Sequence, residues 1–186
     1  MNHFYFSVNF GTLGISWNAE GLLEKIQWSE GHLGVCHKVG MPLALLELID
    51  RIRGYFWRGE PIGEVPWEQL DQSHWSEFQK DVYRTICKIP HGETRTYGWV
   101  AAHLGRGSAC RAVGQALRKN PFPILIPCHR VLSTKSIGGF MGVIDPSQPE
   151  LRLKRSLMDL EEEYCSPLFP FLGTTPSLAA RGTLSS

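Results

Sequence analysis

Residues 96–120, TYGWVAAHLGRGSACRAVGQALRKN, decide how the second half of the chain is interpreted. Thr96 is suited to cap a short helix over 97–104, and Ser108 to cap a second helix over 109–119. Two short helices joined by a glycine-containing turn are typical of a helix-turn-helix, the motif that places one helix in a groove of DNA. A plain helical hairpin has the same pattern, so this stretch alone does not separate the two.

Charge divides the chain into three parts. Residues 79–136 contain ten Lys and Arg against two Asp and Glu, a net charge of +8. The preceding residues carry a net charge of −5 and the following ones −2, which gives +1 for the whole chain. A basic block within a near-neutral chain is typical of a phosphate-binding surface. A solvated face with scattered cations gives the same count, so charge favours a nucleic-acid partner without establishing it.

Composition excludes several classes of protein. The chain has 186 residues, 42% hydrophobic and 20% charged, which excludes disorder or collagen-like repetition as a description of the whole. No apolar run approaches the roughly 20 residues of a membrane-spanning helix, and the first residues lack the pattern of a secretory signal. Five cysteines, an odd number, favour a reducing compartment. We expect a cytoplasmic protein, or a nuclear one in a eukaryote, with no membrane partner.

The fold class expected from these patterns is α/β, beginning with a small N-terminal α/β unit and linker over residues 1–72. Three short segments, 3–10, 13–17 and 22–28, are typical of strands of one sheet. Apolar residues then recur at helical spacing over 41–58.

A second unit is expected over residues 73–165. It begins with a predicted helix over 73–89 and ends with one over 147–163. Between them, the proline-rich segment 121–132 predicts a buried extended stretch that enters a tight turn. Residues 166–186 have few charges and many turn formers, and we expect an unstructured tail there.

The sharpest chemical feature is the sequence IPCHRV at residues 126–131. A cysteine attacks as the thiolate, and a nearby imidazole can remove its proton. Adjacent side chains of a strand point to opposite faces, so Cys128 and His129 need a turn or a bridging water to exchange a proton. A carboxylate should orient the imidazole. The candidates lie on the last predicted helix: Glu161, Glu162 and Glu163. The alternative is a buried, inert cysteine beside a surface histidine.

Together these segments resemble the O6-alkylguanine-DNA alkyltransferases, also called methylated-DNA–protein-cysteine methyltransferases. The matching segments are GETRTY at 92–97, RAVGQA at 111–116, NPFPILIPCHRV at 120–131 and GGF at 138–140. The resemblance implies a ribonuclease-H-like α/β unit followed by a mostly α, winged-helix-like domain that contains the helix-turn-helix.

The resemblance implies a role for each matching residue. Cys128 matches the alkyl acceptor, His129 the base that deprotonates it through a bound water, and Glu161 the carboxylate behind the histidine. Arg111 matches the residue that enters the duplex in place of a flipped nucleotide. Tyr97 matches a residue that helps to rotate the guanine and donates a hydrogen bond to it.

Further residues are expected around this centre. Asn120 matches the asparagine that ties the recognition helix to the cysteine loop, and Phe140 matches the aromatic wall of the guanine pocket, which is more often Tyr. The expected DNA-binding residues are Arg111, Tyr97, Asn120, Arg130 and Thr134. The expected pocket residues are Phe140, Pro123 and Val131.

The implied activity is direct reversal of O6-alkylguanine damage in double-stranded DNA by a monomer without a cofactor. The helix-turn-helix docks in the minor groove, and the alkyl group passes once to the cysteine. Some relatives bind zinc, but the cluster of His32, Cys36 and His37 does not match their arrangement, so no metal is expected. The cysteines expected to be non-catalytic are Cys36, Cys87, Cys110 and Cys165.

Three alternatives stay open. The first is a non-catalytic alkylated-DNA-binding protein of the same fold, which Cys128 argues against because known binders of that type lack the cysteine. The second is an unrelated cysteine hydrolase that uses Cys128 and His129. The third is a plain DNA-binding regulator, for which Cys128 would be dispensable.

Overall fold

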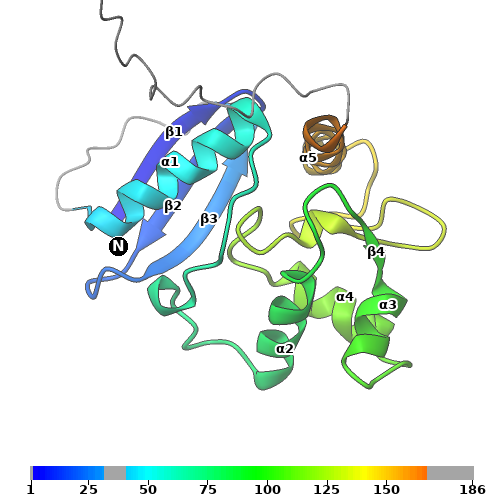
Figure 1. Cartoon of the computed structure of the whole chain (residues 1–186). Helices are drawn as coiled ribbons and strands as arrows, with labels where there is room; N and C mark the ends of the chain where they lie inside the picture. Colours follow the sequence, from blue (N-terminus) through cyan, green and yellow to red (C-terminus); the bar gives the residue numbers. More distant parts are fainter. Residues whose placement is uncertain (1, 32–40, 167–186) are drawn as a thin grey trace, which may run out of the picture.

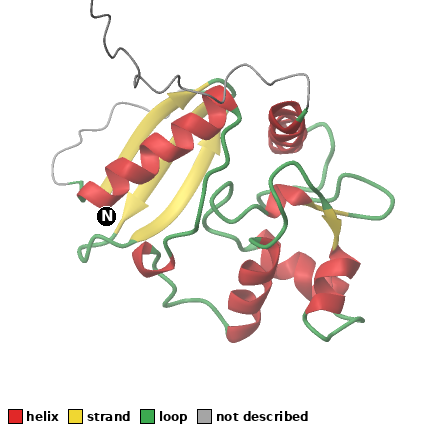
Figure 2. Cartoon of the chain, viewed as in Figure 1, coloured by secondary structure: helices red, strands yellow, loops and turns green. Residues whose placement is uncertain are grey.

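The computed structural model describes residues 2–31 and 41–166. A sheet covered by one helix lies beside a group of short helices and a last, longer helix (Figure 1, Figure 2). The expected α/β class is confirmed. All but the first residue of the tail predicted over 166–186 lies outside the described residues.

Three antiparallel strands in the order β1-β2-β3 form the N-terminal sheet. They are β1 (Asn2–Val8), β2 (Gly11–Trp17) and β3 (Leu23–Ser29), each within three residues of its predicted bounds. Alternate residues of β1 are buried, which gives the sheet one face for the core.

Helix α1 (Leu43–Arg58) lies across this sheet, as Figure 1 shows. Its apolar stripe, expected from the spacing of its residues, is buried and includes Ile52, Tyr55 and Phe56. The helix ends at Gly59, which adopts a left-handed conformation with φ 70° and donates its N–H to the carbonyl of Tyr55.

The second half contains four α-helices in its described part: α2 (Glu77–Ile86), α3 (Tyr97–His103), α4 (Cys110–Arg118) and α5 (Pro149–Cys165). All four were predicted, with errors at their ends. Helix α2 begins four residues later than expected because Ser76 caps it, accepting the N–H of Gln79.

In the helix-turn-helix, one predicted helix cap is confirmed and the other is wrong. The Thr96 hydroxyl accepts the N–H of Trp99 at 3.1 Å, so the expected cap of α3 is confirmed. The prediction that Ser108 caps the next helix is wrong, since α4 follows Ala109, which makes no side-chain cap bond.

Two short strands and a turn connect this motif to the cysteine. Strand β4 (Arg95–Thr96), directly before α3, pairs in parallel with β5 (Val131–Leu132). The 3₁₀ turn η2 (Cys128–Arg130) immediately precedes β5. The burial and the tight turn predicted over 121–132 are therefore confirmed. The predicted extended conformation is wrong for 122–126, where Ile124 has φ 78° and the N–H of Ile126 donates to the carbonyl of Phe122 at 2.8 Å. The pairing of β4 with β5 fixes Cys128 close to α3. A further 3₁₀ turn, η1 (Trp67–Gln69), lies between α1 and α2.

Among residues 2–31 and 41–166, no helix combines the length and the apolarity that crossing a bilayer requires.

Candidate active site

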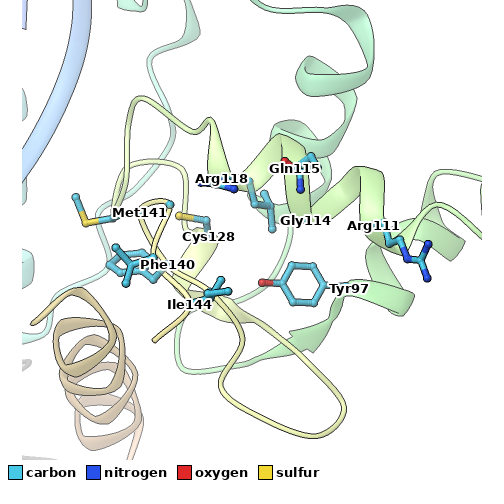
Figure 3. Close-up of a pocket in the computed structure, with 13 residues that line it drawn as sticks. Tyr97, Arg111, Gly114, Gln115, Arg118, Cys128, Phe140, Met141 and Ile144 are labelled. Atoms are coloured by element: carbon cyan, nitrogen blue, oxygen red, sulfur yellow. The ribbon is translucent and has the colours of Figure 1, made fainter. Parts of the chain in front are cut away.

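Cys128 lines a cavity of about 350 Å³. Helix α4 and the loop over 139–144 supply most of the lining, and Tyr97 of α3 completes it. Figure 3 shows the Tyr97 ring directed toward Cys128, whereas Arg111 lies at the far end of the cavity. The cavity therefore joins the buried cysteine to the second helix of the helix-turn-helix.

Arg111 is exposed, and among the described residues it has no ion pair. Tyr97 is half-buried, and burial raises the pKa of its phenol, so it stays protonated. Arg111 is thus free to reach outward from the cavity rim, and Tyr97 can donate a hydrogen bond within the cavity.

Asn120 holds the cysteine turn. Its amide nitrogen donates to the carbonyl of Ile126 at 3.0 Å and to Sγ of Cys128 at 3.2 Å, while its amide oxygen accepts the N–H of Phe122. Because Asn120 follows α4, these bonds couple the end of that helix to the position of the sulfur. Its amide faces the cysteine turn in this structure.

The thiol of Cys128 is not intrinsically acidic. Burial raises its pKa, and the hydrogen bond from Asn120 and the charge of Lys154 offset this only in part. With only 5% of the residue exposed, the sulfur rests as a thiol. Nucleophilic chemistry here requires a base.

His129 is placed to be that base. It is fully buried, and its Nε2 lies 2.7 Å from Oε1 of Glu161. A carboxylate only accepts, so Nε2 carries the proton and Nδ1 has a free lone pair. No described residue bonds to Nδ1. Burial lowers the pKa of His129, although Glu161 acts in the opposite direction. The lowered pKa keeps the imidazole ring neutral.

Glu161 is the carboxylate behind the histidine. Burial would raise its pKa, but hydrogen bonds from His129 and Arg130 outweigh burial and hold the pKa well below its usual range. The backbone N–H of Gly92 donates to Oε2 at 3.0 Å, and the Tyr55 hydroxyl donates to Oε1 at 2.8 Å. The other two candidates, Glu162 and Glu163, are exposed.

The expectation that Arg130 contacts DNA is wrong, because its side chain does not lie at the surface. Its guanidinium is buried and donates to both oxygens of Glu161, at 2.9 and 3.0 Å, and to the carbonyl of Ile89. Moving it to solvent would leave a buried carboxylate without its main counter-charge. Thr134 lies in the exposed loop after β5, and its contact with DNA stays a prediction.

Two expected pocket residues also need correction. Pro123 and Val131 are buried, but neither is among the described residues that line the cavity. The backbone of Val131 is engaged in β5, and its carbonyl accepts a hydrogen bond from Lys154. Phe140 does line the cavity, as an aromatic wall.

Three residues near the centre were missed by sequence reasoning: Tyr55, His91 and Lys154. The Lys154 ammonium is buried and donates to the carbonyls of Val131 at 2.7 Å and Gly139 at 3.1 Å. Burial lowers its pKa to about 8, against the opposing effect of Cys128. A lysine three residues from both Leu151 and Leu157, on the buried face of a helix, was a usable signal.

Metal and disulfide chemistry find no support in the described part of the chain. No group of three or more His, Cys, Asp or Glu side chains there is arranged to hold a metal ion. The cluster of His32, Cys36 and His37 lies outside that part. Four cysteines within it are free thiols: Cys87, Cys110, Cys128 and Cys165.

Comparison with known proteins agrees with this geometry. A family model described as "6-O-methylguanine DNA methyltransferase, DNA binding domain" matches residues 77–163. The crystal structure of Mycobacterium tuberculosis OGT in complex with DNA superposes with a TM-score of 0.67 and 25% identity, covering 88% of this chain and 94% of that one.

Two curated relatives carry the name methylated-DNA–protein-cysteine methyltransferase. The one from Methanosarcina barkeri is 43% identical over 88 residues, 47% of this chain, and the match spans only about half of that relative, 51%. The one from Methanothermobacter thermautotrophicus is 35% identical over 150 residues, 80% of this chain and 78% of that protein. With its cysteine, histidine and carboxylate placed as described, the chain belongs to the methylated-DNA–protein-cysteine methyltransferase family.

Proposed function

We propose that this protein repairs O6-alkylguanine in double-stranded DNA by transferring the alkyl group to Cys128. The observation that carries the proposal is that Cys128 lines a cavity bordered by α4 while a buried histidine–carboxylate pair stands behind it. A structural cysteine needs neither feature. The relatives are named methylated-DNA–protein-cysteine methyltransferases, which supports the same reaction.

DNA docks through the helix-turn-helix, with α4 in the minor groove. The alkylated base leaves the stack because its O6 is otherwise buried in a base pair, and extrusion costs a few kcal/mol. Arg111, exposed at the rim of the cavity, enters the space that the base vacates and offsets part of this cost. The extruded base then occupies the cavity between Tyr97 and Phe140.

The reaction begins with proton transfer from Cys128. The lone pair on Nδ1 of His129 takes the thiol proton, directly or through one water, and Glu161 stabilises the imidazolium that forms. Because burial raises the pKa of the thiol, this transfer controls how much thiolate exists.

Displacement at the alkyl carbon follows. The sulfur lone pair forms the S–C bond as the C–O6 bond breaks, and the electron pair of the broken C–O6 bond leaves with the guanine. The departing guanine anion takes up the proton that the thiol gave up, while a hydrogen bond from Tyr97 stabilises it. The product is a thioether, which water does not cleave, so each molecule acts once.

Mass spectrometry after mixing with an O6-methylguanine duplex tests the proposal. We expect one methyl group on the peptide that contains Cys128, and none in a Cys128→Ala variant that still binds DNA. A Cys110→Ala control should still acquire the methyl group. Tight binding without a mass gain would instead support the non-catalytic binder, and repeated hydrolysis of an ester without DNA would support the hydrolase.

A further inference from the structure

Tyr55 brings a side chain of the N-terminal unit into the buried network behind Cys128. It lies on α1, is fully buried, and donates its hydroxyl to Oε1 of Glu161 at 2.8 Å. The same hydroxyl oxygen lies 3.3 Å from Nε2 of His129. One carboxylate oxygen therefore accepts from the imidazole and from a phenol that belongs to the other half of the chain.

The surroundings of Tyr55 keep it a donor. Burial, and after it the charge of Glu161, raises the pKa of the phenol well above its ordinary value, so the hydroxyl keeps its proton. The ring packs edge-on against His91 and Phe56, with centroids 6.0 and 5.5 Å away. A donor fixed on two sides in this way restricts where Oε1 can lie.

We propose that Tyr55 is a positioning residue, through which the N-terminal unit holds the Glu161–His129 pair for proton transfer from Cys128. The inference rests on the proposed function, since that proton transfer belongs to alkyl transfer. A hydrogen bond from Tyr55 reduces the negative charge that Oε1 presents to His129. Without it, the imidazole binds a proton more readily, and a protonated His129 cannot act as the base.

Other titratable or charged groups face the same pair. They come from the turn after α2, from η2 and from α5: His91, Arg130, Cys128 and Lys154. A Tyr55→Phe substitution leaves all four in place. A change in the titration of His129 in that variant is therefore caused by the missing hydroxyl.

The experiment compares Tyr55→Phe with Tyr83→Phe in the full chain. Tyr83 is also fully buried, but its hydroxyl donates to the backbone carbonyl of Ala116. The protonation midpoint of His129 is followed by NMR of ¹³C-labelled histidine and assigned with His129→Gln. We expect Tyr55→Phe to raise the midpoint by about 0.5–1 pH unit and Tyr83→Phe to leave it unchanged.

A second measurement uses transfer from free O6-methylguanine, which avoids effects on DNA binding. The ratio of the single-turnover rates at pH 8 and pH 6 should rise in Tyr55→Phe, by at most about tenfold per unit of midpoint shift, and stay constant in Tyr83→Phe. Replacing Tyr55 by 3-fluorotyrosine, a stronger donor of nearly the same shape, should move the His129 midpoint in the opposite direction. This second replacement preserves the packing if the phenylalanine variant does not fold.

The two proposals fail in different ways. An unmoved His129 midpoint in folded Tyr55 variants overturns the positioning role, and so does an equal loss of rate at both pH values. A wild-type protein that transfers no methyl group overturns the proposed function, whereas the NMR titration still reports on Tyr55.

Discussion

The imidazole of His129 and the carboxylate of Glu161 form a hydrogen bond of 2.7 Å inside the core, 32 residues apart in sequence. Both residues are at most 1% exposed. A buried carboxylate is costly unless its charge is paired, and here the guanidinium of Arg130 supplies the pairing. The network that orients the imidazole of His129 is thus also a part of what holds α5 against the cysteine turn.

Glu161→Gln tests separately how the network orients His129 and how it stabilises the fold. The amide cannot stabilise the imidazolium, so we expect single-turnover transfer to fall by about 10- to 100-fold. It also leaves Arg130 buried without its counter-charge, which should lower the free energy of unfolding by about 3–5 kcal/mol. Rapid-quench kinetics and urea unfolding measure the two effects, with Glu162→Gln as the exposed control. Wild-type rates in Glu161→Gln would remove the carboxylate from the mechanism.

Stability should fall as the solution becomes acidic. Burial lowers the pKa of His129, and hydrogen bonds lower that of Glu161, so both groups bind protons more readily in the unfolded chain. Their contribution is complete above the unfolded pKa of histidine, about 6.5, and is lost as pH falls below it, first through His129 and then through Glu161. Urea unfolding between pH 8 and pH 4 measures this slope. His129→Gln should reduce the dependence of the unfolding free energy on pH at the upper end of this range. His74→Gln, an exposed control, should not.

The sequence predicted the local elements better than the network between them. The three strands of the N-terminal sheet, the five α-helices and the cysteine turn follow from periodicity, caps and prolines, and Glu161 was among three neighbouring candidates. The parallel pairing of β4 with β5 was not predicted. Tyr55 was read only as part of an apolar stripe, because nothing in α1 reveals that its hydroxyl meets a carboxylate 106 residues later. Arg130 was expected to contact DNA, whereas its guanidinium is buried and donates to Glu161, a contact that no local pattern in the sequence indicates.

Arg111→Ala should distinguish base extrusion from chemistry. The side chain lies at the far end of the cavity from Cys128, so its loss should leave the reaction with free O6-methylguanine near the wild-type rate. Transfer from a duplex should fall by about 10- to 100-fold because the gap left by the extruded base is no longer filled. Single-turnover rates on the two substrates give the comparison, with Arg84→Ala of α2 as the control. Equal losses on both substrates would count against intercalation.

Lys154→Met tests whether a buried cation supports the nucleophile. Lys154 ties the carbonyl of Val131, beside the cysteine turn, to that of Gly139, at the edge of the cavity. Its charge also lowers the pKa of the Cys128 thiol, against the effect of burial. Methionine keeps most of the volume and removes the charge, so the thiol pKa should rise, and each unit reduces the thiolate fraction about tenfold. The pH dependence of transfer from free O6-methylguanine measures this shift. Arg155→Met, an exposed neighbour, is the control. An unchanged pH profile in a folded Lys154→Met variant would limit the lysine to joining the two loops.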